Sequence, residues 1–415
     1  MKMMALKVRI YPTQEQCILI NKTFGCCRQI YNLMLADRIE FYNNNIKGKE
    51  LSKTQRLDLY KSYKPLTEKQ IKEIYPYMTE VSSVALQQSR RDMEGAFIKF
   101  FRGKTKFPRF HSKKENRFSY KENNGIRFNW YKRTIRLPKI QEVKFRLRSL
   151  PNWYTPNCKL CNVTVSKSRS EQYYASMIFE IEELPKLKSE NQTIGLDFSL
   201  SNVYVDSNGL SGRDFGYIPQ KQNHLKQLNK LKRKFARKKK GSLNREKARI
   251  KLARMEQHIA NSRKNWIEKE TLRLVRDNNI IGVESLKLEN MIKFSRNSKN
   301  YVDTSWGYFV TRLSDKAERY SCNVVKSDTF FASSKICHIC GYKKTDLKLY
   351  MRHWTCPVCN TEHNRDVNAA INLKNNAIKI LREAEEFRSA EGVEELASLA
   401  LAQFGASVET ERKTS

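Results

Sequence analysis

The sequence predicts an α+β protein built from several domains. Its length of 415 residues corresponds to two or three compact units at roughly 150 residues each. Near the N-terminus apolar side chains alternate as in a strand, whereas neighbouring segments repeat them at helical spacing. Two cysteine pairs near the C-terminus have the spacing of a small zinc module. Apolar residues make up 40% and aromatic residues 11% of the chain, which is enough to form sizeable cores.

The charge of the chain favours a polyanionic partner. There are 79 Lys and Arg against 43 Asp and Glu, a formal net charge of +36. The sequence has no uncharged apolar stretch of about 18 residues, and its first apolar run is too short for a secretory signal. We therefore expect an intracellular, cytoplasmic protein without a membrane partner. In a reducing compartment, its ten cysteines favour metal binding over disulfides.

The N-terminal half predicts a small β-barrel interrupted by helices. Residues 5–11 alternate apolar and basic side chains, and Thr13 with Gln16 forms a capping-box pattern that begins a largely helical region. Two further strands are expected at 161–165 and 173–181, around a polar turn. Together with the first strand they would complete the barrel.

Aromatic residues end this helical region. Met93, Phe97, Phe100 and Phe101 repeat at helical spacing, which we interpret as a core face rather than a ligand site. The segment 97–139 then carries 14 Lys or Arg against two Glu, with seven further rings between them. Cations for phosphates and flat rings for bases suit an RNA or single-strand surface. The alternative is a solvated β-rich segment whose rings point inward.

A second basic stretch predicts a helical hairpin over 221–275. Residues 221–254 contain 15 Lys or Arg and one acid, yet leucines recur at three- and four-residue steps, and Gly241-Ser242 provides a turn. We favour contact with a phosphate backbone over a role in solubility alone. The candidate nucleic-acid contacts in the two basic segments are Lys232, Arg233, Lys234, Arg237, Lys238, Arg109 and Arg117.

The most specific motif is Cys337-x2-Cys340-x15-Cys356-x2-Cys359, the spacing of a four-cysteine zinc site. Four thiolates leave no open position for water, so the zinc would be structural. We expect the nearby His338, His353 and His363 not to be ligands. The other cysteines, including the Cys158 and Cys161 pair, are interpreted as packing thiols.

Three acids form a candidate catalytic set. Asp197 and Glu284 each end an apolar, strand-like run, and Asp366 lies at the predicted start of a helix just after the cysteine module. Acids in such positions are costly unless cations lie between them, and three carboxylates could hold two Mg²⁺ for phosphodiester cleavage. Each acid taken alone is more often a cap or turn residue.

These motifs resemble the TnpB proteins of bacterial insertion sequences, in order over about residues 5–375. The last block, four cysteines followed by Arg365-Asp366-x-Asn368-Ala-Ala, is highly specific. The other matching segments are Val8–Thr13, Phe24–Arg28, Phe107–Phe110, Gly195–Asp197 and Val283-Glu284. One departure is Asn364, which stands where many relatives have an Asp.

The resemblance implies an RNA-guided DNA endonuclease with a split RuvC-like, RNase H-type domain, related to compact CRISPR type V effectors. Asp197, Glu284 and Asp366 match the family's catalytic acids. The partners would be a guide RNA from the transposon end and double-stranded DNA, recognised beside a short flanking motif through the N-terminal half. The cofactors would be catalytic Mg²⁺ and structural Zn²⁺. We expect a monomer with its RNA, associated with the bacterial nucleoid when bound to DNA.

The resemblance and the composition together predict the domain boundaries. They are 1–12 (first strand of the β-barrel, or wedge, domain), 13–100 (helical recognition insertion), 101–188 (rest of the barrel), 189–330 (RuvC-like domain with the hairpin), 331–362 (zinc ribbon contacting target nucleic acid), 363–380 (last RuvC-like segment) and 381–415 (flexible acidic tail).

Three other functions compete with this prediction. A nuclease-silent, RNA-guided DNA-binding repressor would keep the fold but would not need the three acids. A CRISPR type V effector would share the chemistry and differ in genomic context. A transposase is disfavoured because the sequence lacks a His-hydrophobe-His plus tyrosine arrangement.

Overall fold

The computed structural model describes residues 2–115, 118–182, 187, 190–217, 224–348 and 350–391. The chain divides near residue 184 into an N-terminal and a C-terminal unit. Among the described residues no helix is long and apolar enough to cross a membrane.

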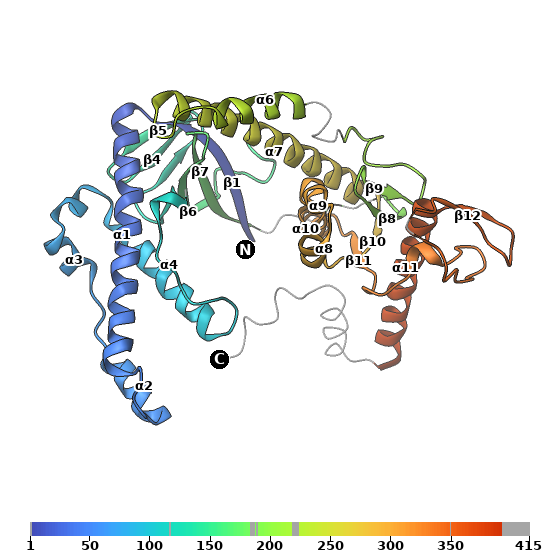
Figure 1. Cartoon of the computed structure of the whole chain (residues 1–415), viewed down its shortest axis with the longest axis horizontal. Helices are drawn as coiled ribbons and strands as arrows, with labels where there is room; N and C mark the ends of the chain where they lie inside the picture. Colours follow the sequence, from blue (N-terminus) through green and yellow to red (C-terminus); the bar gives the residue numbers. More distant parts are fainter. Residues whose placement is uncertain are drawn as a thin grey trace. The chain divides into compact units, whose positions relative to one another are not determined.

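The N-terminal unit is built on a seven-stranded antiparallel sheet with the order β2-β6-β7-β1-β5-β4-β3 (Figure 1). Strand β1 lies at its centre and pairs along most of its length with β7 and, at Arg9–Tyr11, with β5. The strands are β1 (Lys2–Tyr11), β2 (Phe118–Glu122), β3 (Arg127–Asn129), β4 (Thr134–Leu137), β5 (Gln141–Arg146), β6 (Lys159–Lys167) and β7 (Tyr173–Ile181).

The predicted closed barrel is not confirmed, because this sheet is open. Within the described residues, β2 pairs only with β6 and β3 only with β4, so the two edge strands do not meet. Strand β3 has three residues and β4 four. Such short strands offer few backbone groups for a closing ladder, and closure depends on long-range pairing that strand patterns do not encode.

Helices fill the connection between β1 and β2. The predicted capping box is confirmed: Gln16 N–H donates to Thr13 Oγ1, and Thr13 N–H donates to the Gln16 side chain. The helices are α1 (Gln14–Asn45), α2 (Lys53–Ser62), α3 (Glu68–Ile74), the 3₁₀ turn η1 (Pro76–Glu80), α4 (Ser83–Phe101) and the 3₁₀ turn η2 (Lys113–Glu115).

The core of this unit joins α1 and α4 to the sheet. Met93 and Phe97 are buried and Phe100 is partly buried, as the helical spacing predicted. The prediction for Phe101 is wrong, since its ring is 67% exposed. Phe101 is the last residue of α4, and among the described residues it is not one of those that pack in this core. In the following segment the rings of Tyr131, Phe107 and Phe110 are also exposed, whereas that of Tyr120 is buried.

The C-terminal unit contains a four-stranded sheet with the order β11-β10-β8-β9. Strands β8, β10 and β11 are parallel, and β9 is antiparallel to β8. The two units together confirm the α+β content predicted for the chain, while the RuvC-like α/β assignment of the second domain stays a prediction. The strands are β8 (Thr193–Ser199), β9 (Val203–Asp206), β10 (Ile280–Val283) and β11 (Asn323–Lys326).

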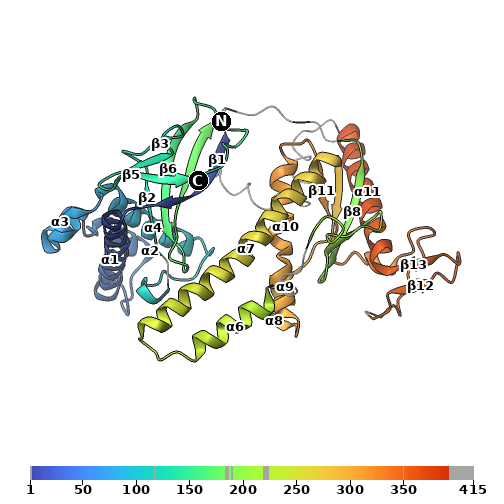
Figure 2. The same ribbon diagram turned by 90° about the horizontal axis from the view of Figure 1, so that it is seen from above.

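Helix α11 (Arg365–Glu391) packs directly on this sheet (Figure 2). Two glycines permit the close approach. A Cβ added at Gly195 of β8 would lie 1.9 Å from the Ala370 carbonyl oxygen, and one at Gly282 of β10 would lie 2.3 Å from that of Leu373. Only a residue without a side chain fits at such contacts. The tail expected from residue 381 begins as part of this helix, and residues 392–415 lie outside the described part.

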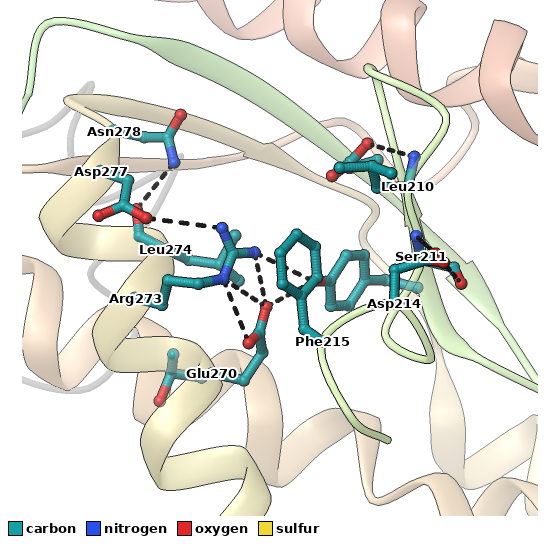
Figure 3. Close-up of polar contacts among 12 residues, drawn as sticks. Leu210, Ser211, Asp214, Phe215, Glu270, Arg273, Leu274, Asp277 and Asn278 are labelled. Atoms are coloured by element: carbon teal, nitrogen blue, oxygen red, sulfur yellow. Dashed lines mark hydrogen bonds and ion pairs between the residues drawn. The ribbon is translucent and has the colours of Figure 1, made fainter. Parts of the chain in front are cut away.

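The basic hairpin consists of α6 (Leu225–Ala236) and α7 (Leu243–Asp277), as predicted, with Ser242 capping α7 (Figure 2). A buried polar cluster fixes the far end of α7 to β9 (Figure 3). The buried Glu270 carboxylate accepts a hydrogen bond from Tyr204 Oη at 2.5 Å and from Arg273 Nη2 at 2.7 Å. The Arg273 guanidinium in turn stacks on the Phe215 ring, 3.6 Å from its centroid. The hairpin is thus anchored in the C-terminal core.

The remaining elements complete the C-terminal unit. Helix α10 packs on α7 and carries the buried Trp306 and Phe309, and the β12–β13 hairpin belongs to the cysteine module. Their bounds are α8 (Leu288–Phe294), α9 (Ser298–Thr304), α10 (Trp306–Ala317), the 3₁₀ turn η3 (Ser333–Lys335), β12 (His353–Thr355) and β13 (Glu362–Asn364).

Candidate active site and metal centre

The three predicted acids come from neighbouring elements. Asp197 lies in β8, and Glu284 directly follows β10. Strands β8 and β10 are parallel, and their last paired residues are Leu196 and Val283. The residues that follow, Asp197 and Glu284, therefore lie at the same end of this strand pair. Asp366 is the second residue of α11. Because side chains alternate along a strand, Asp197 shares the face of Gly195, against which α11 packs.

The electrostatics of Asp197 indicate that Glu284 and Asp366 lie close to it. The pKa of Asp197 is well above its ordinary value, first because its carboxyl is withdrawn from water and then because Glu284 and Asp366 repel its charge. Arg365 and Arg352 oppose this rise. Burial also raises the pKa of Glu284, and Arg365 again opposes it. The structure therefore brings all three acids together.

Arg352 contacts this group from the cysteine module. Its Nη1 lies 3.0 Å from Asp366 Oδ1 and 3.3 Å from Oδ2. The side chain is 63% exposed, yet it also forms this ion pair with the site.

Asn364, the departure from the family pattern, has a local role in the structure. Its side-chain Oδ1 accepts hydrogen bonds from the backbone N–H of Asp366 at 3.0 Å and of Val367 at 3.2 Å. Asn364 is therefore the N-cap of α11, a position at which Asn and Asp serve about equally well. The substitution preserves the helix start that positions Asp366.

The four predicted cysteines form a compact cluster. Their sulfur atoms all lie within 4.8 Å of one another, and this is the one such group of potential ligands among the described residues. Cys337 Sγ is 3.6 Å from Cys359 Sγ, and Cys340 Sγ is 3.5 Å from Cys356 Sγ. A tetrahedral zinc with sulfur ligands at about 2.3 Å separates them by about 3.8 Å. The cluster could therefore bind zinc.

The two cysteine knuckles have the same turn. Gly341 and Asn360 each follow the second cysteine with a positive φ, and each donates its N–H to the first cysteine's carbonyl at 2.9 Å. The Thr361 hydroxyl and backbone N–H bond the Cys359 sulfur and lower its pKa to about 6. The thiolate needed for a metal ligand is thereby favoured.

His363 lies beside the cysteine cluster. Its Nε2 is 3.1 Å from Cys337 Sγ, but the compact group consists of the four cysteines alone. The described cysteines outside the group include Cys26, Cys27 and Cys322, which are buried in the cores, and the partly buried Cys158 and Cys161.

Sequence reasoning missed a row of asparagines on α11. Asn368 Nδ2 donates to the Ile336 carbonyl at 2.7 Å, and its Oδ1 accepts the backbone N–H of His338. Asn372 Nδ2 also donates to the Ile336 carbonyl, at 2.6 Å, and Asn376 donates to Ser327. Asn368 and Asn372 tie the cysteine module to the helix that carries Asp366, and Asn376 ties this helix to the end of β11. Their four-residue spacing on an apolar helix was the available signal.

The predicted nucleic-acid contacts lie at the surface where the structure describes them. Lys232, Arg233 and Lys234 are exposed on α6, and Arg237 and Lys238 are exposed in the turn that follows. Arg109 is exposed in the loop after α4. Arg117 lies outside the described residues.

Comparison with known proteins identifies the family. A protein of Streptomyces pristinaespiralis named "Putative RNA-guided DNA endonuclease" is 32% identical over 372 residues, which cover 89% of this chain and 88% of that protein. The chain belongs to the TnpB family. "Putative RNA-guided DNA endonuclease InsQ" of Escherichia coli strain K12 is 26% identical, with coverage of 90% and 92%.

Three family models match parts of this TnpB-family chain. A helix-turn-helix domain of IS605 OrfB proteins matches residues 1–47, a "Probable transposase" model of the same proteins matches 176–295, and a "Cas12f1-like, TNB domain" matches 306–373. Over 2–47 the structure has strand β1 and the single continuous helix α1, rather than a helix-turn-helix.

Solved structures cover nearly all of the chain, but their TM-scores are low. A cryo-EM structure of a Cas12f1–sgRNA–target DNA complex is 15% identical, with coverage of 90% and 99% and a TM-score of 0.33. CasPhi-2 (Cas12j) bound to crRNA is 10% identical, with coverage of 91% and 98% and a TM-score of 0.33.

Proposed function

We propose that this TnpB-family chain is an RNA-guided DNA endonuclease and that Asp197, Glu284 and Asp366 are its catalytic acids. The observation that carries the assignment of the acids is their convergence from β8, the end of β10 and the start of α11, which gives three carboxylates at one place in a chain of net charge +36. An acid group of this kind repels nucleic-acid phosphates unless cations lie between them.

The donor set suits Mg²⁺. Carboxylate oxygens are the ligands that Mg²⁺ prefers, and a bound cation would relieve the repulsion that raises the pKa of Asp197. Three carboxylates could share two such ions, and we assign them to two Mg²⁺. When bound, Mg²⁺ would supply a nucleophilic water and stabilise the leaving oxygen.

The protein's own residues would position the site and neutralise charge. Asn364 caps α11 and thereby orients Asp366. Arg352 and Arg365 supply positive charge beside the acids, where a scissile phosphate would bring negative charge. The zinc ribbon would be structural and hold Arg352 in place through the asparagine contacts to α11.

The basic surfaces would hold the nucleic acids. The exposed cations at the end of α6 and in the following turn suit a phosphate backbone, and their contacts would be independent of sequence. Base pairing with the guide would supply specificity for double-stranded DNA beside a short flanking motif. We retain the predicted domain boundaries, a monomer with its RNA, and a site of action in the bacterial cytoplasm as parts of this proposal.

A nuclease-silent repressor is the competing function. It would need the basic surfaces but not three converging acids, so the same observation argues against it. Genomic context, a repeat array against transposon ends, separates the transposon-encoded enzyme from a CRISPR effector.

The test is to express the chain with its flanking DNA, sequence the RNA that copurifies, and incubate the complex with Mg²⁺ and a plasmid library. Each plasmid carries a guide match beside randomised bases. We expect one defined RNA and linear product at a restricted flanking motif. A defined RNA with binding but no cleavage would establish the repressor instead. The absence of any defined RNA would contradict guidance altogether.

A further inference from the structure

An aromatic pocket in the N-terminal unit involves none of the three acids and none of the four clustered cysteines. It has a volume of about 660 Å³, within the range of small-ligand sites. Helix α1, the end of α2, the end of α4 and the loop after α4 form its walls, and Figure 1 shows α4 beside α1. Rings that line it include Tyr42, Tyr60, Tyr63, Phe97, Phe101 and Phe107.

Several of these rings are partly exposed to solvent. Phe101 is 67% exposed, Phe107 46%, Tyr42 44% and Tyr60 40%. Large apolar side chains gathered at one exposed place indicate a binding surface more often than isolated exposed rings do. Ring contacts of Phe107 with Phe97 and Phe100, and of Phe41 with Tyr63, join the walls of the pocket to one another.

The charge around the pocket favours a polyanion. Arg38 is the one charged side chain among the described lining residues, and its guanidinium lies 4.8 Å from the centroid of Phe97 and 5.9 Å from that of Tyr63. The adjoining segment 95–114 contains seven Lys or Arg and no acid. The neighbouring Asp37 carboxylate accepts hydrogen bonds from the Tyr63 hydroxyl and the Leu66 N–H.

This combination suits an unpaired nucleobase with its flanking phosphates. Aromatic rings and Arg planes stack on splayed-out bases, while cations outside the pocket contact the phosphates on either side. A base in a DNA duplex is paired and stacked, whereas the loops and ends of a folded RNA offer free bases. Resting on the proposed function, we propose that the aromatic pocket binds an unpaired base of the guide RNA.

The test uses the full chain and the RNA that copurifies with the wild type. The variant Tyr60→Ala/Phe101→Ala removes one ring from α2 and one from α4, and Tyr60→Phe/Phe101→Tyr keeps both rings. The matched control is Tyr77→Ala, which removes a ring that is 47% exposed in the same unit, outside both the pocket and the basic segment 97–139. We expect the double alanine variant to bind the RNA about tenfold or more weakly at fixed salt, with the other two unchanged. Thermal melting checks that all variants fold.

Crosslinking locates the base. RNA carrying 4-thiouridine at single positions is irradiated with the wild-type protein, and the attached peptides are identified by mass spectrometry. We expect one unpaired position to crosslink to a lining ring such as Tyr42 or Phe107. Crosslinks only outside the pocket, or unchanged RNA affinity in the folded double alanine variant, would overturn the inference.

Other occupants give distinct results. A change in sedimentation without a change in RNA affinity would assign the pocket to a second copy of the chain and overturn the proposal. Weaker DNA binding with normal RNA binding would assign it to the target strand and also overturn it. If the wild type copurifies no defined RNA, the guided function itself fails. If the wild type binds RNA and cuts but the double variant keeps its RNA affinity, only the pocket assignment fails.

Discussion

Gly195 of strand β8 lies directly beneath Ala370 of helix α11, so close that a Cβ on the glycine would lie 1.9 Å from the alanine's carbonyl oxygen. Ala370 is one helical turn after Asp366, and Gly195 is two residues before Asp197 on the same strand face. One close backbone contact therefore positions two of the three acids. Gly282 and Glu284 repeat the relationship on the neighbouring strand.

The Gly195→Ala substitution should therefore be strongly destabilising. Its methyl group meets backbone atoms that cannot move without displacing α11, so we expect a loss of at least about 3 kcal/mol in the free energy of unfolding. Denaturant titration measures this change. The matched control is Gly95→Ala within α4, where an added Cβ meets open space. It should stabilise the protein by up to about 1 kcal/mol. Equal effects of the two substitutions would contradict the packing role of Gly195.

The cysteine cluster predicts one tightly bound zinc per chain. Cys356→Ser removes a buried sulfur from the cluster and should abolish stoichiometric zinc in elemental analysis, while lowering the melting temperature. Cys161→Ser, in β6 outside the cluster, should retain the metal. Retention of zinc by the Cys356 variant would show that the cluster is not the site.

Loss of the Arg352 side chain should slow cleavage without weakening the binding of guide and target. Arg352→Ala removes the cation 3.0 Å from Asp366, and we expect cleavage to slow by about 100-fold while guide and target binding stay within twofold. Apparent affinity for the divalent ion should not weaken, because the site becomes more negative. Titration of the metal and single-turnover cleavage measure the two effects. Arg382→Ala, exposed on α11, is the control. A proportional loss of target binding would make Arg352 a DNA contact instead.

Glu122 predicts a pH dependence of stability. It is 1% exposed at the end of β2, and burial raises its pKa to about 7, against which the Ser82 hydrogen bond acts. The folded protein therefore holds this proton more tightly than the unfolded chain. The free energy of unfolding is therefore highest below about pH 4.5 with respect to this group. It falls by about 3 kcal/mol at most as the pH rises through 7.

Glu122→Gln removes the charge and keeps a hydrogen-bonding side chain. Relative to wild type, it should be stabilised at pH 8 and nearly unchanged at pH 4.5, as measured by thermal unfolding at both values. Glu142→Gln, at an exposed position of β5, should show no such difference. An effect of Glu122→Gln that is the same at both pH values would contradict a buried, titrating carboxyl.

Local features of the molecule could be predicted from the sequence. The capping box at Thr13, the turn at Gly241-Ser242 and the knuckle spacing of the cysteines all depend on residues a few positions apart. Asp197 and Glu284 were recognisable because each ends an apolar run, and Asp366 because it lies at a predicted helix start just after the cysteine module. In these cases the chemistry of neighbouring residues decides the structure.

Features that depend on distant contacts could not be predicted. Among the described residues, the sheet stays open because its edge strands β2 and β3 do not pair with each other, and Phe101 is exposed because it lies outside the core that buries Phe97. The pairing of Arg352 with Asp366 and the contacts of Asn368 with Ile336 arise only when the cysteine module docks on α11. A single sequence contains no signal for the partner in such contacts.

The most direct test of the central claim compares cleavage and target binding by the RNA complexes of wild type and Asp197→Asn in Mg²⁺. The substitution keeps the side chain's size and removes the charge that would hold the metal. We predict that the variant binds guide and target within about twofold of wild type and cuts at least about 1000-fold more slowly. Cutting at the wild-type rate, or a loss of binding together with cutting, would contradict the assignment of Asp197 as a catalytic metal ligand.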